Sequence, residues 1–202
     1  MTQPEQKPYH HGDLRAALLD AAEQELVARG VEAFSLRSVA KRAGVSHAAP
    51  AHHFGDTGGL LTALAADGFR RFLGFQLRRE ASASADPVSQ LAGAGLGYID
   101  FAMAHPALFR LIFTSARINR EDPGFLAVAQ ASYQHLLAIT RTAGGNDSDI
   151  PAVWAGAHGL ADLLMSGQLP ALARMQPADR DRALAAAMKR SFPSGAHRPD
   201  ST

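Results

Sequence analysis

Residues 35–54 read SLRSVAKRAGVSHAAPAHHF, and this stretch decides the fold. Its first half repeats apolar side chains at three- and four-residue intervals, which predicts a helix capped by Ser35. The apolar positions are Leu36, Val39, Ala40 and Ala43. Gly44 then ends the helix, because glycine adopts a positive φ without a steric penalty. A second helix is expected to begin after a cap at Ser46 and to bury Phe54, which makes a helix-turn-helix.

The same stretch carries positive charge and no carboxylate. Its cations are Arg37, Lys41 and Arg42. Three histidines, His47, His52 and His53, can donate hydrogen bonds to phosphate oxygens. Two surface helices with a solvated basic face would carry similar charges. The order of cap, apolar period, glycine turn, second cap, small residues and aromatic nevertheless favours a DNA-binding element.

The composition of the whole chain limits the other classes. Its 202 residues, 47% of them apolar, allow a sizeable core. No apolar run approaches the roughly eighteen residues of a membrane span, and the first residues lack the apolar stretch of a secretion signal. We therefore expect a cytoplasmic protein with no membrane partner. The net charge of +1 means that positive potential for DNA must be local.

Several short motifs together resemble one protein family. The motifs are Tyr9-His10-His11-Gly12-Asp13-Leu14-Arg15, Ser35-Leu36-Arg37, Ala43-Gly44-Val45-Ser46, His53-Phe54 and Leu60-Leu61. They resemble the DNA-binding domain of TetR-family (tetracycline-repressor-like) transcriptional regulators, from about Tyr9 to Phe75. The resemblance implies an all-helical homodimer that binds a double-stranded DNA operator with its N-terminal domain and a small-molecule effector with its C-terminal domain.

The expected DNA contacts lie in the N-terminal arm, the helix-turn-helix and the start of the next helix. They are Lys7, Ser35, Arg37, Ser46, His47, Ala48, Ala49, Pro50, His52, His53 and Thr57. Two positions depart from the family pattern: Ala51 replaces a phosphate-contacting tyrosine, and Thr57 replaces a phosphate-contacting lysine. We therefore expect weaker DNA binding with a shallower salt dependence. A helical protein-interaction module that has lost specific DNA binding stays open as an alternative.

Helix signals run through the whole chain without a strand pattern, so the predicted fold class is all-α with about nine helices. A three-helix head is expected at residues 9–55 and an effector-binding and dimerisation body at residues 56–190. The two are joined by a long helix that starts at a cap on Asp56 and ends near Ala81. Later helices are expected to start at Asp86-Pro87, His105-Pro106, Asp122-Pro123 and Asp149-Ile150-Pro151. Tails at residues 1–8 and 191–202 are expected to be disordered.

The body contains a second informative stretch, WAGAHGLADLLMSGQL at residues 154–169. Spacings of four place Trp154, His158 and Asp162 on one helical stripe, where His158 can hydrogen-bond Asp162. With HPALFRLIF at residues 105–113, this stretch resembles the WHG-type C-terminal domain of one TetR subfamily. We expect an effector cavity lined by aromatic and polar side chains, with core packing as the alternative for each of them. The candidates are Phe72, Phe75, Tyr98, Phe101, Phe109, Phe113, Tyr133, Trp154, His158, Asp162 and Met165.

The last two long helices are expected to form the dimer interface, again with a core face as the alternative. Their small and apolar candidates are Leu160, Leu164, Leu169, Ala183, Leu184, Ala187 and Met188. One recognition helix reads only a few base pairs, so two heads roughly 34–36 Å apart are needed to select a palindromic operator. The predicted function is a repressor that a small, largely apolar effector releases from DNA by shifting the spacing of the heads.

Catalytic and metal sites are not expected. The histidines of the helix-turn-helix lack the four-residue spacing that places two metal ligands on one helix face. The chain has no cysteine, no nucleophile elbow and no phosphate loop. Gly93, Gly95 and Gly97 follow no strand, so they predict a close helix crossing or room for a ligand. We therefore predict no enzyme, no cofactor and no metal.

Overall fold

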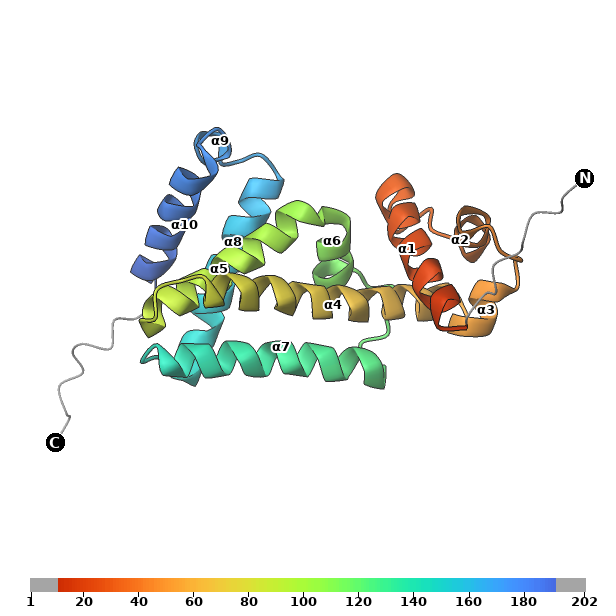
Figure 1. Cartoon of the computed structure of the whole chain (residues 1–202), viewed down its shortest axis with the longest axis horizontal. Coiled ribbons are helices and arrows are strands. Elements are labelled where there is room, and N and C mark those ends of the chain that lie inside the picture. The colour runs from red at the N-terminus through yellow and green to blue at the C-terminus, as the bar shows by residue number, and fades with distance from the viewer. Residues whose placement is uncertain (1–10, 192–202) are drawn as a thin grey trace, which may run out of the picture.

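The computed structural model describes residues 11–191, which form helices and the turns between them (Figure 1). In chain order the elements are α1 (His11–Arg29), α2 (Leu36–Ala43), α3 (Ala49–Phe54), α4 (Thr57–Ala81), α5 (Pro87–Ala104), α6 (Pro106–Thr114), α7 (Pro123–Thr142), the 3-10 turn η1 (Asp147–Asp149), α8 (Ile150–Met165), α9 (Pro170–Ala173) and α10 (Pro177–Ser191). No strand occurs within residues 11–191, so the all-α prediction is confirmed. One α-helix more than expected is found there, since the four-residue α9 is too short to show a helical period.

The long helix α4 is the axis of the molecule (Figure 1). We call residues 11–55, with α1 to α3, the head, and residues 56–191 the body. The head packs at one end of α4, whereas α5, α6 and α7 pack along its length, and α8 and α10 pack on α5 (Figure 1). Of the predicted tails at residues 1–8 and 191–202, Ser191 is the last residue of α10. The other tail residues, which include Lys7 of the arm, lie outside the described residues.

Several of the helix caps expected from the sequence are present, whereas the starts at His105 and Asp149 make no side-chain cap bond. The Ser35 side chain accepts from the Ser38 N–H at 3.2 Å, and Gly44 has a φ of 67°. Asp56 accepts from the Gly59 N–H at 2.8 Å and thereby starts α4. These caps satisfy N–H groups that have no partner within their own helix, which fixes where each helix begins.

One helix boundary differs from the prediction. The recognition helix α3 begins at Ala49, not after Ser46, and residues 46–48 form a turn. Its N-cap, Ala48, makes no side-chain bond. Pro50 explains the difference, because a helix beginning directly after Ser46 would place the proline beyond the first turn, where it loses a hydrogen bond and clashes with a carbonyl.

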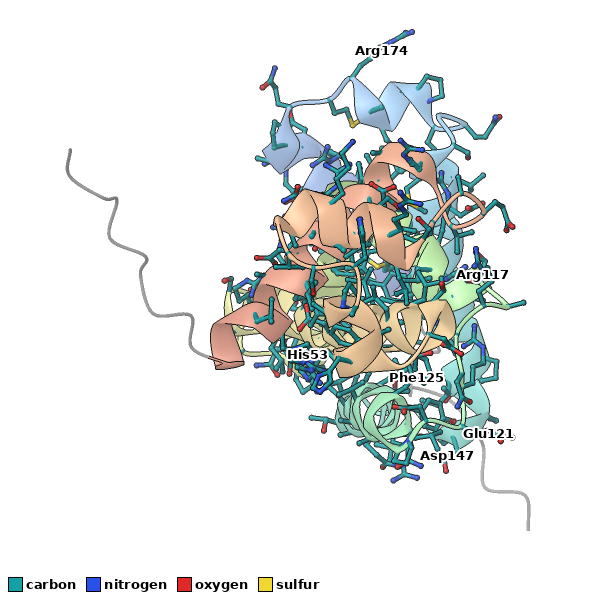
Figure 2. All side chains as sticks on the ribbon, turned by 90° about the vertical axis from the view of Figure 1, so that its right-hand side faces the viewer. His53, Arg117, Glu121, Phe125, Asp147 and Arg174 are labelled. Carbon is teal, nitrogen blue, oxygen red and sulfur yellow. The ribbon has the colours of Figure 1, made fainter. Side chains whose placement is uncertain are left out.

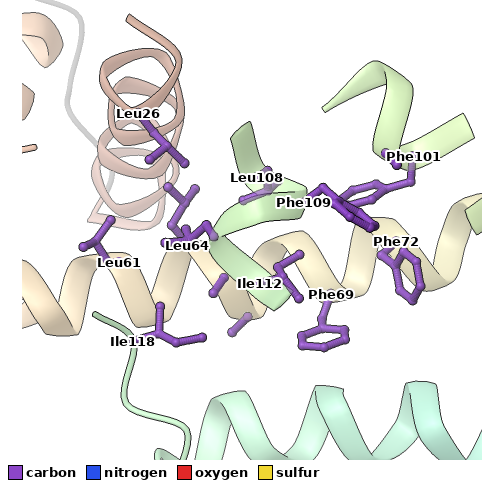
Figure 3. Packing of buried hydrophobic residues seen from close by; sticks show 14 of the residues in the cluster. Leu26, Leu61, Leu64, Phe69, Phe72, Phe101, Leu108, Phe109, Ile112 and Ile118 are labelled. Carbon is purple, nitrogen blue, oxygen red and sulfur yellow. The ribbon is translucent and has the colours of Figure 1, made fainter. Parts of the chain in front are cut away.

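A single apolar core runs from the head into the body (Figure 3). Leu26 of α1 packs toward Leu64 of α4, and the same cluster continues through Ile112 of α6 to Phe72 and Phe101 (Figure 3). All of these side chains are buried. Because the two parts share one core, a shift of α4 or α6 in the body also displaces the surface on which the head packs.

The predicted close helix crossing is confirmed between α4 and α5. A Cβ at Gly97 would lie 2.4 Å from the Phe75 carbonyl oxygen, and one at Gly93 would lie 2.8 Å from the Arg79 carbonyl oxygen. A Cβ at Gly95 would lie 2.4 Å from the sulfur of Met188. Glycine at positions 93 and 97 therefore lets the α5 backbone lie directly on α4, and glycine at position 95 makes room for the Met188 side chain of α10.

Candidate functional site

The exposed face of the helix-turn-helix contains about half of the predicted DNA contacts. Arg37, Ser46, His47, Ala48 and His52 are exposed, on α2, on the turn and on α3. Half-buried positions are Ser35, Ala49, His53 and Thr57, and the hydroxyl of Ser35 is already engaged as the cap of α2. Pro50 is buried and packs α3 against the rest of the head, so it presents no surface to a partner.

Close backbone packing holds α3 in place. A Cβ at Gly59 would lie 2.0 Å from the Phe54 carbonyl oxygen, so the end of α3 rests directly on the first turn of α4. The guanidinium of Arg15 in α1 lies over the Phe54 ring, 5.3 Å from its centre. Only glycine at position 59 permits the close approach of α3 to α4, and this contact fixes the angle between the two helices.

A buried carboxylate fastens α1 to α2. The side chain of Glu25 is 2% exposed and accepts from Arg42 Nη2 at 2.9 Å and Nε at 3.2 Å. Burial raises the pKa of Glu25, but donors on Arg42 and Ser38 outweigh that effect and leave it below its ordinary value. Glu25 was not predicted, although it interrupts an apolar stripe of α1. Since Glu25 neutralises Arg42, the cations of residues 35–54 without an ion-pair partner among the described residues are Arg37 and Lys41.

The body contains a cavity of about 240 Å³ between α4, α5, α7 and α8, which is partly open to solvent where the exposed Tyr133 and Trp154 line it. Five of the predicted ligand residues line it: Phe72, Tyr98, Phe113, Tyr133 and Trp154. The others do not line it, namely Phe75, Phe101, Phe109, His158, Asp162 and Met165. Phe101 is fully buried in the core, and Asp162 is exposed on the outer side of α8.

Apart from Tyr133, sequence reasoning missed the side of the cavity formed by α7. Spacings of three and four place its lining residues on one stripe, which is the signal that would have identified them. They are Phe125, Ala129, Ser132, Leu136 and Ile139. Gln76 of α4 and Arg120 of the α6–α7 loop were missed as well, and both are polar.

Trp154 and His158 meet at a tyrosine and not at Asp162. The hydroxyl oxygen of Tyr98 accepts from Trp154 Nε1 at 3.3 Å and lies 2.6 Å from Nδ1 of His158. Burial raises the pKa of Tyr98 well above its ordinary value, so the phenol keeps its proton and can donate it to Nδ1. The rings of Phe109 and His158 stack with their centres 5.3 Å apart, and neither residue lines the cavity. The predicted stripe is therefore mainly a polar link between α5 and α8.

The α6–α7 loop, residues 115–122, connects the cavity with the head. Arg117 donates to the carbonyl of Val31 in the head, and the N–H of Asn119 donates to Thr62 Oγ1 of α4 at 2.8 Å. Arg120 in the same loop lines the cavity. In the view from the head end, Arg117 lies well apart from His53, so the loop meets a different side of the head (Figure 2).

An ion-pair cluster forms a second connection between head and body. Arg71 of α4 donates to Glu23 of α1 at 3.1 Å, and its Nη2 lies 3.0 Å from Nδ1 of His105 at the start of α6. Burial and, to a lesser degree, the charge of Arg71 lower the pKa of His105. His105 is therefore disposed to remain neutral beside the guanidinium.

The described residues offer no single membrane-spanning helix and no metal cluster. None of their helices has by itself the length and apolar character to cross a membrane, and only α5 and α6 taken together, with a bend of 110° between them, meet that test. Within residues 11–191, no cluster of three or more His, Asp or Glu side chains is placed to hold a metal ion.

Two family models match the chain. One, described as bacterial regulatory proteins of the tetR family, matches residues 18–64. The other, described as a tetracyclin repressor-like C-terminal domain, matches residues 91–191. The first match covers α2, α3 and most of α1, and the second covers the helices that surround the cavity, apart from α4.

Solved structures and curated proteins give similar matches. A protein of unknown function from Rhodococcus sp. RHA1 is 32% identical, with a TM-score of 0.77 over 93% of this chain and 99% of that one. A TetR-like transcriptional regulator from the same organism is 18% identical, covers 91% and 97%, and has a TM-score of 0.63, which shows a shared fold. The regulator BetI of Burkholderia cenocepacia (strain HI2424) is 38% identical over 77 residues, or 38% of this chain. The match spans only 40% of that relative's length.

Proposed function

This chain belongs to the tetR family of bacterial regulatory proteins, and on that premise we propose that it is a repressor that binds a palindromic operator as a homodimer and is released by a small, mainly apolar effector. The family is one of transcriptional regulators and not of enzymes. One observation carries the proposal: a rigidly seated α3 and a body cavity are both attached to the same helix, α4. A repressor of this kind acts in the cytoplasm, where bacterial DNA lies.

The head supplies the DNA contacts in this proposal. Arg37 and Lys41 offer exposed positive charge, and the small side chains at Ala48 and Ala51 let the backbone of the turn and of α3 approach the major groove. His47 and His52 are exposed and can donate to phosphate or base edges. With so few cations, we expect operator binding with a modest dependence on salt.

The body supplies the response to the effector. Phe69, Phe72 and Gln76 of α4 line the cavity, while Leu60 and Leu61 of the same helix lie in the core beneath the head. A ligand that favours one position of α4 therefore favours one position of the head. The α6–α7 loop offers a parallel route.

The dimer is proposed to form through outward faces of α8 and α10. Leu164, Leu184 and Met188, which we expected in the interface, are buried within the protomer and belong to its own core. Leu163 of α8 is 41% exposed, and a Cβ at Gly156 or Gly159 would meet no atom within 4 Å. These features leave room for a second helix to approach α8 closely.

The DNA-binding part is tested by fluorescence anisotropy with DNA from the chain's own upstream region, measured over a series of salt concentrations. Restoring the family pattern with Ala51→Tyr and Thr57→Lys should tighten binding and steepen the salt slope by roughly one unit for the added cation. Thr142→Lys, an exposed position at the end of α7, is the matched control and should leave both unchanged.

The alternative is a helical interaction module without specific DNA binding, favoured by the absence of the two phosphate-contacting residues at positions 51 and 57. That function requires the unmodified chain to show no specific retention at low salt. Specific binding by the unmodified chain would exclude it. Specific binding acquired only by the double variant would support it.

A further inference from the structure

Two polar side chains face the cavity without protein partners. Gln76 of α4 is 8% exposed and Ser132 of α7 is 7% exposed, and both line the cavity. Neither side chain has a hydrogen-bond partner among the described residues. The two residues are largely buried, but their amide and hydroxyl are not among the fully enclosed polar atoms without a partner, so they stay accessible from the cavity. Most polar groups in such positions are satisfied by protein, water or ligand.

The other polar groups around the cavity are already engaged or lie at its margin. The Tyr98 hydroxyl and the Trp154 indole N–H bond to each other, and the hydroxyl also bonds to His158. The Tyr133 side chain is exposed. Gln76 and Ser132 are thus the buried groups available to hold a polar atom of a ligand.

The charges around the cavity select against charged ligands at this position. No Asp, Glu, Lys or His is among its lining residues, so an ammonium group would meet no carboxylate. Arg120 is the lining cation, but it is exposed and donates to the Ile112 carbonyl at 3.2 Å. Arg120 lies before the start of α7. Ser132 lies seven residues beyond Phe125, or about 10 Å along the helix, so Arg120 is at a different end of the cavity from Ser132. Beyond Gln76 and Ser132, Glu80 and His135 pair with each other at 2.9 Å.

We propose that the cavity takes an uncharged, mainly hydrocarbon molecule whose single amide, hydroxyl or carbonyl group hydrogen-bonds to Gln76 and Ser132. The amide of Gln76 offers both donors and an acceptor, and the Ser132 hydroxyl offers one of each, so the pair suits any of these groups. The aromatic and aliphatic lining accommodates the hydrocarbon part. This inference rests on the proposed function, in that the cavity is the effector site, and it names the chemical class of the effector.

Trp154 provides a direct test, because it is the only tryptophan in the chain and it lines the cavity. Octanamide, octanol, octanoate and octylammonium share one chain length and differ in their polar group. Titrating each into the full chain without DNA, with tryptophan fluorescence and thermal unfolding as readouts, should show binding by octanamide and octanol. We expect the two charged compounds to bind at least tenfold more weakly, the equivalent of one unsatisfied charge or hydrogen bond.

Variants separate the hydrogen bonds from general packing. Gln76→Leu and Ser132→Ala should each weaken octanamide binding by roughly tenfold. Gln76→Leu should also raise the unfolding temperature of the ligand-free protein, because it removes an unpaired amide, and a purely structural role for Gln76 would give the opposite shift. Gln134→Leu makes the same exchange at a solvent-exposed position of α7, so it is the matched control and should leave binding unchanged.

The proposal is overturned if octanoate or octylammonium binds as tightly as octanamide, if neither neutral compound binds, or if both variants bind octanamide as the unmodified chain does. Operator binding is measured separately with and without octanamide. If octanamide binds through Gln76 but leaves DNA binding unchanged, the proposed release mechanism fails while the chemical class stands.

Discussion

The head and the body of this protein are packed in different ways. In the head, α3 lies directly on α4 at Gly59, and the buried Glu25 fastens α1 to α2. In the body, α4, α5, α7 and α8 surround unfilled space of about 240 Å³. The head is thus suited to a fixed recognition geometry, whereas the body is less tightly filled and can gain stability when a ligand enters.

The contrast is informative because both parts share α4 and one core. Unfilled apolar space lowers stability through lost contacts, so the cavity is retained at an energetic cost. A ligand that fills it would stabilise one position of α4 and, through Arg117 and Glu23, one position of the head. Substitutions can test this contrast by disturbing the close packing of the head or by filling the cavity of the body.

The largest effect is expected for Gly59→Ala. The added Cβ would lie 2.0 Å from a backbone oxygen that cannot rotate away, so α3 must move, at a cost of about 3 kcal/mol or more. Gly74→Ala in the same helix is the control: its Cβ would come no closer than 3.4 Å to the flexible tip of Arg78, so it should stabilise the protein by up to roughly 1 kcal/mol. Chemical denaturation measures both. Equal effects of the two variants would contradict the close contact at α3.

Glu25→Gln should have the second-largest effect, a loss of about 2 kcal/mol, because it replaces charge-assisted hydrogen bonds of a buried carboxylate by weaker neutral ones. Hydrogen exchange should show the loss mainly in α1 and α2. Glu121→Gln, at an exposed position of the α6–α7 loop, serves as the control. A uniform loss of protection across the body would show that Glu25 does not act locally.

In the body, Ala129→Leu should act in the opposite direction. The larger side chain enters existing space and should stabilise the ligand-free chain by about 1 kcal/mol. It should also reduce binding of any cavity ligand, as measured by thermal unfolding with and without that ligand. Ala127→Leu, which adds the same group at an exposed position of α7, should do neither.

The smallest effect is a dependence of stability on pH at the junction of head and body. The pKa of His105 is held below its ordinary value of 6.5, first by burial and then by Arg71. The unfolded chain therefore binds more protons than the native one below pH 6.5, so stability should fall as the pH decreases through that range. The lowered pKa of Glu25 adds a further loss below pH 4.5. The His105→Gln variant should lack the first loss, which unfolding measured at stepped pH would detect.

The accuracy of the sequence predictions differed between head and body for a physical reason. The caps at Ser35 and Asp56 and the turn at Gly44 were predicted correctly, since each depends on residues within one helical turn. Pro50 showed the limit of this approach: its position in the first turn of α3 was readable, but its burial was not. The stripe of Trp154 and His158 was also readable, yet their shared partner Tyr98 was not.

The sequence by itself determined the all-helical fold, most helix boundaries, the helix-turn-helix and the family, because periodicity, caps and short motifs are local properties of the chain. Only the tertiary structure decided which residues border the cavity and which join head to body. Tyr98 and His158 lie 60 positions apart, and Arg117 and Val31 lie 86 apart. Such contacts depend on how whole helices pack, and a pattern within one helix shows which face is apolar but not which helix will cover it.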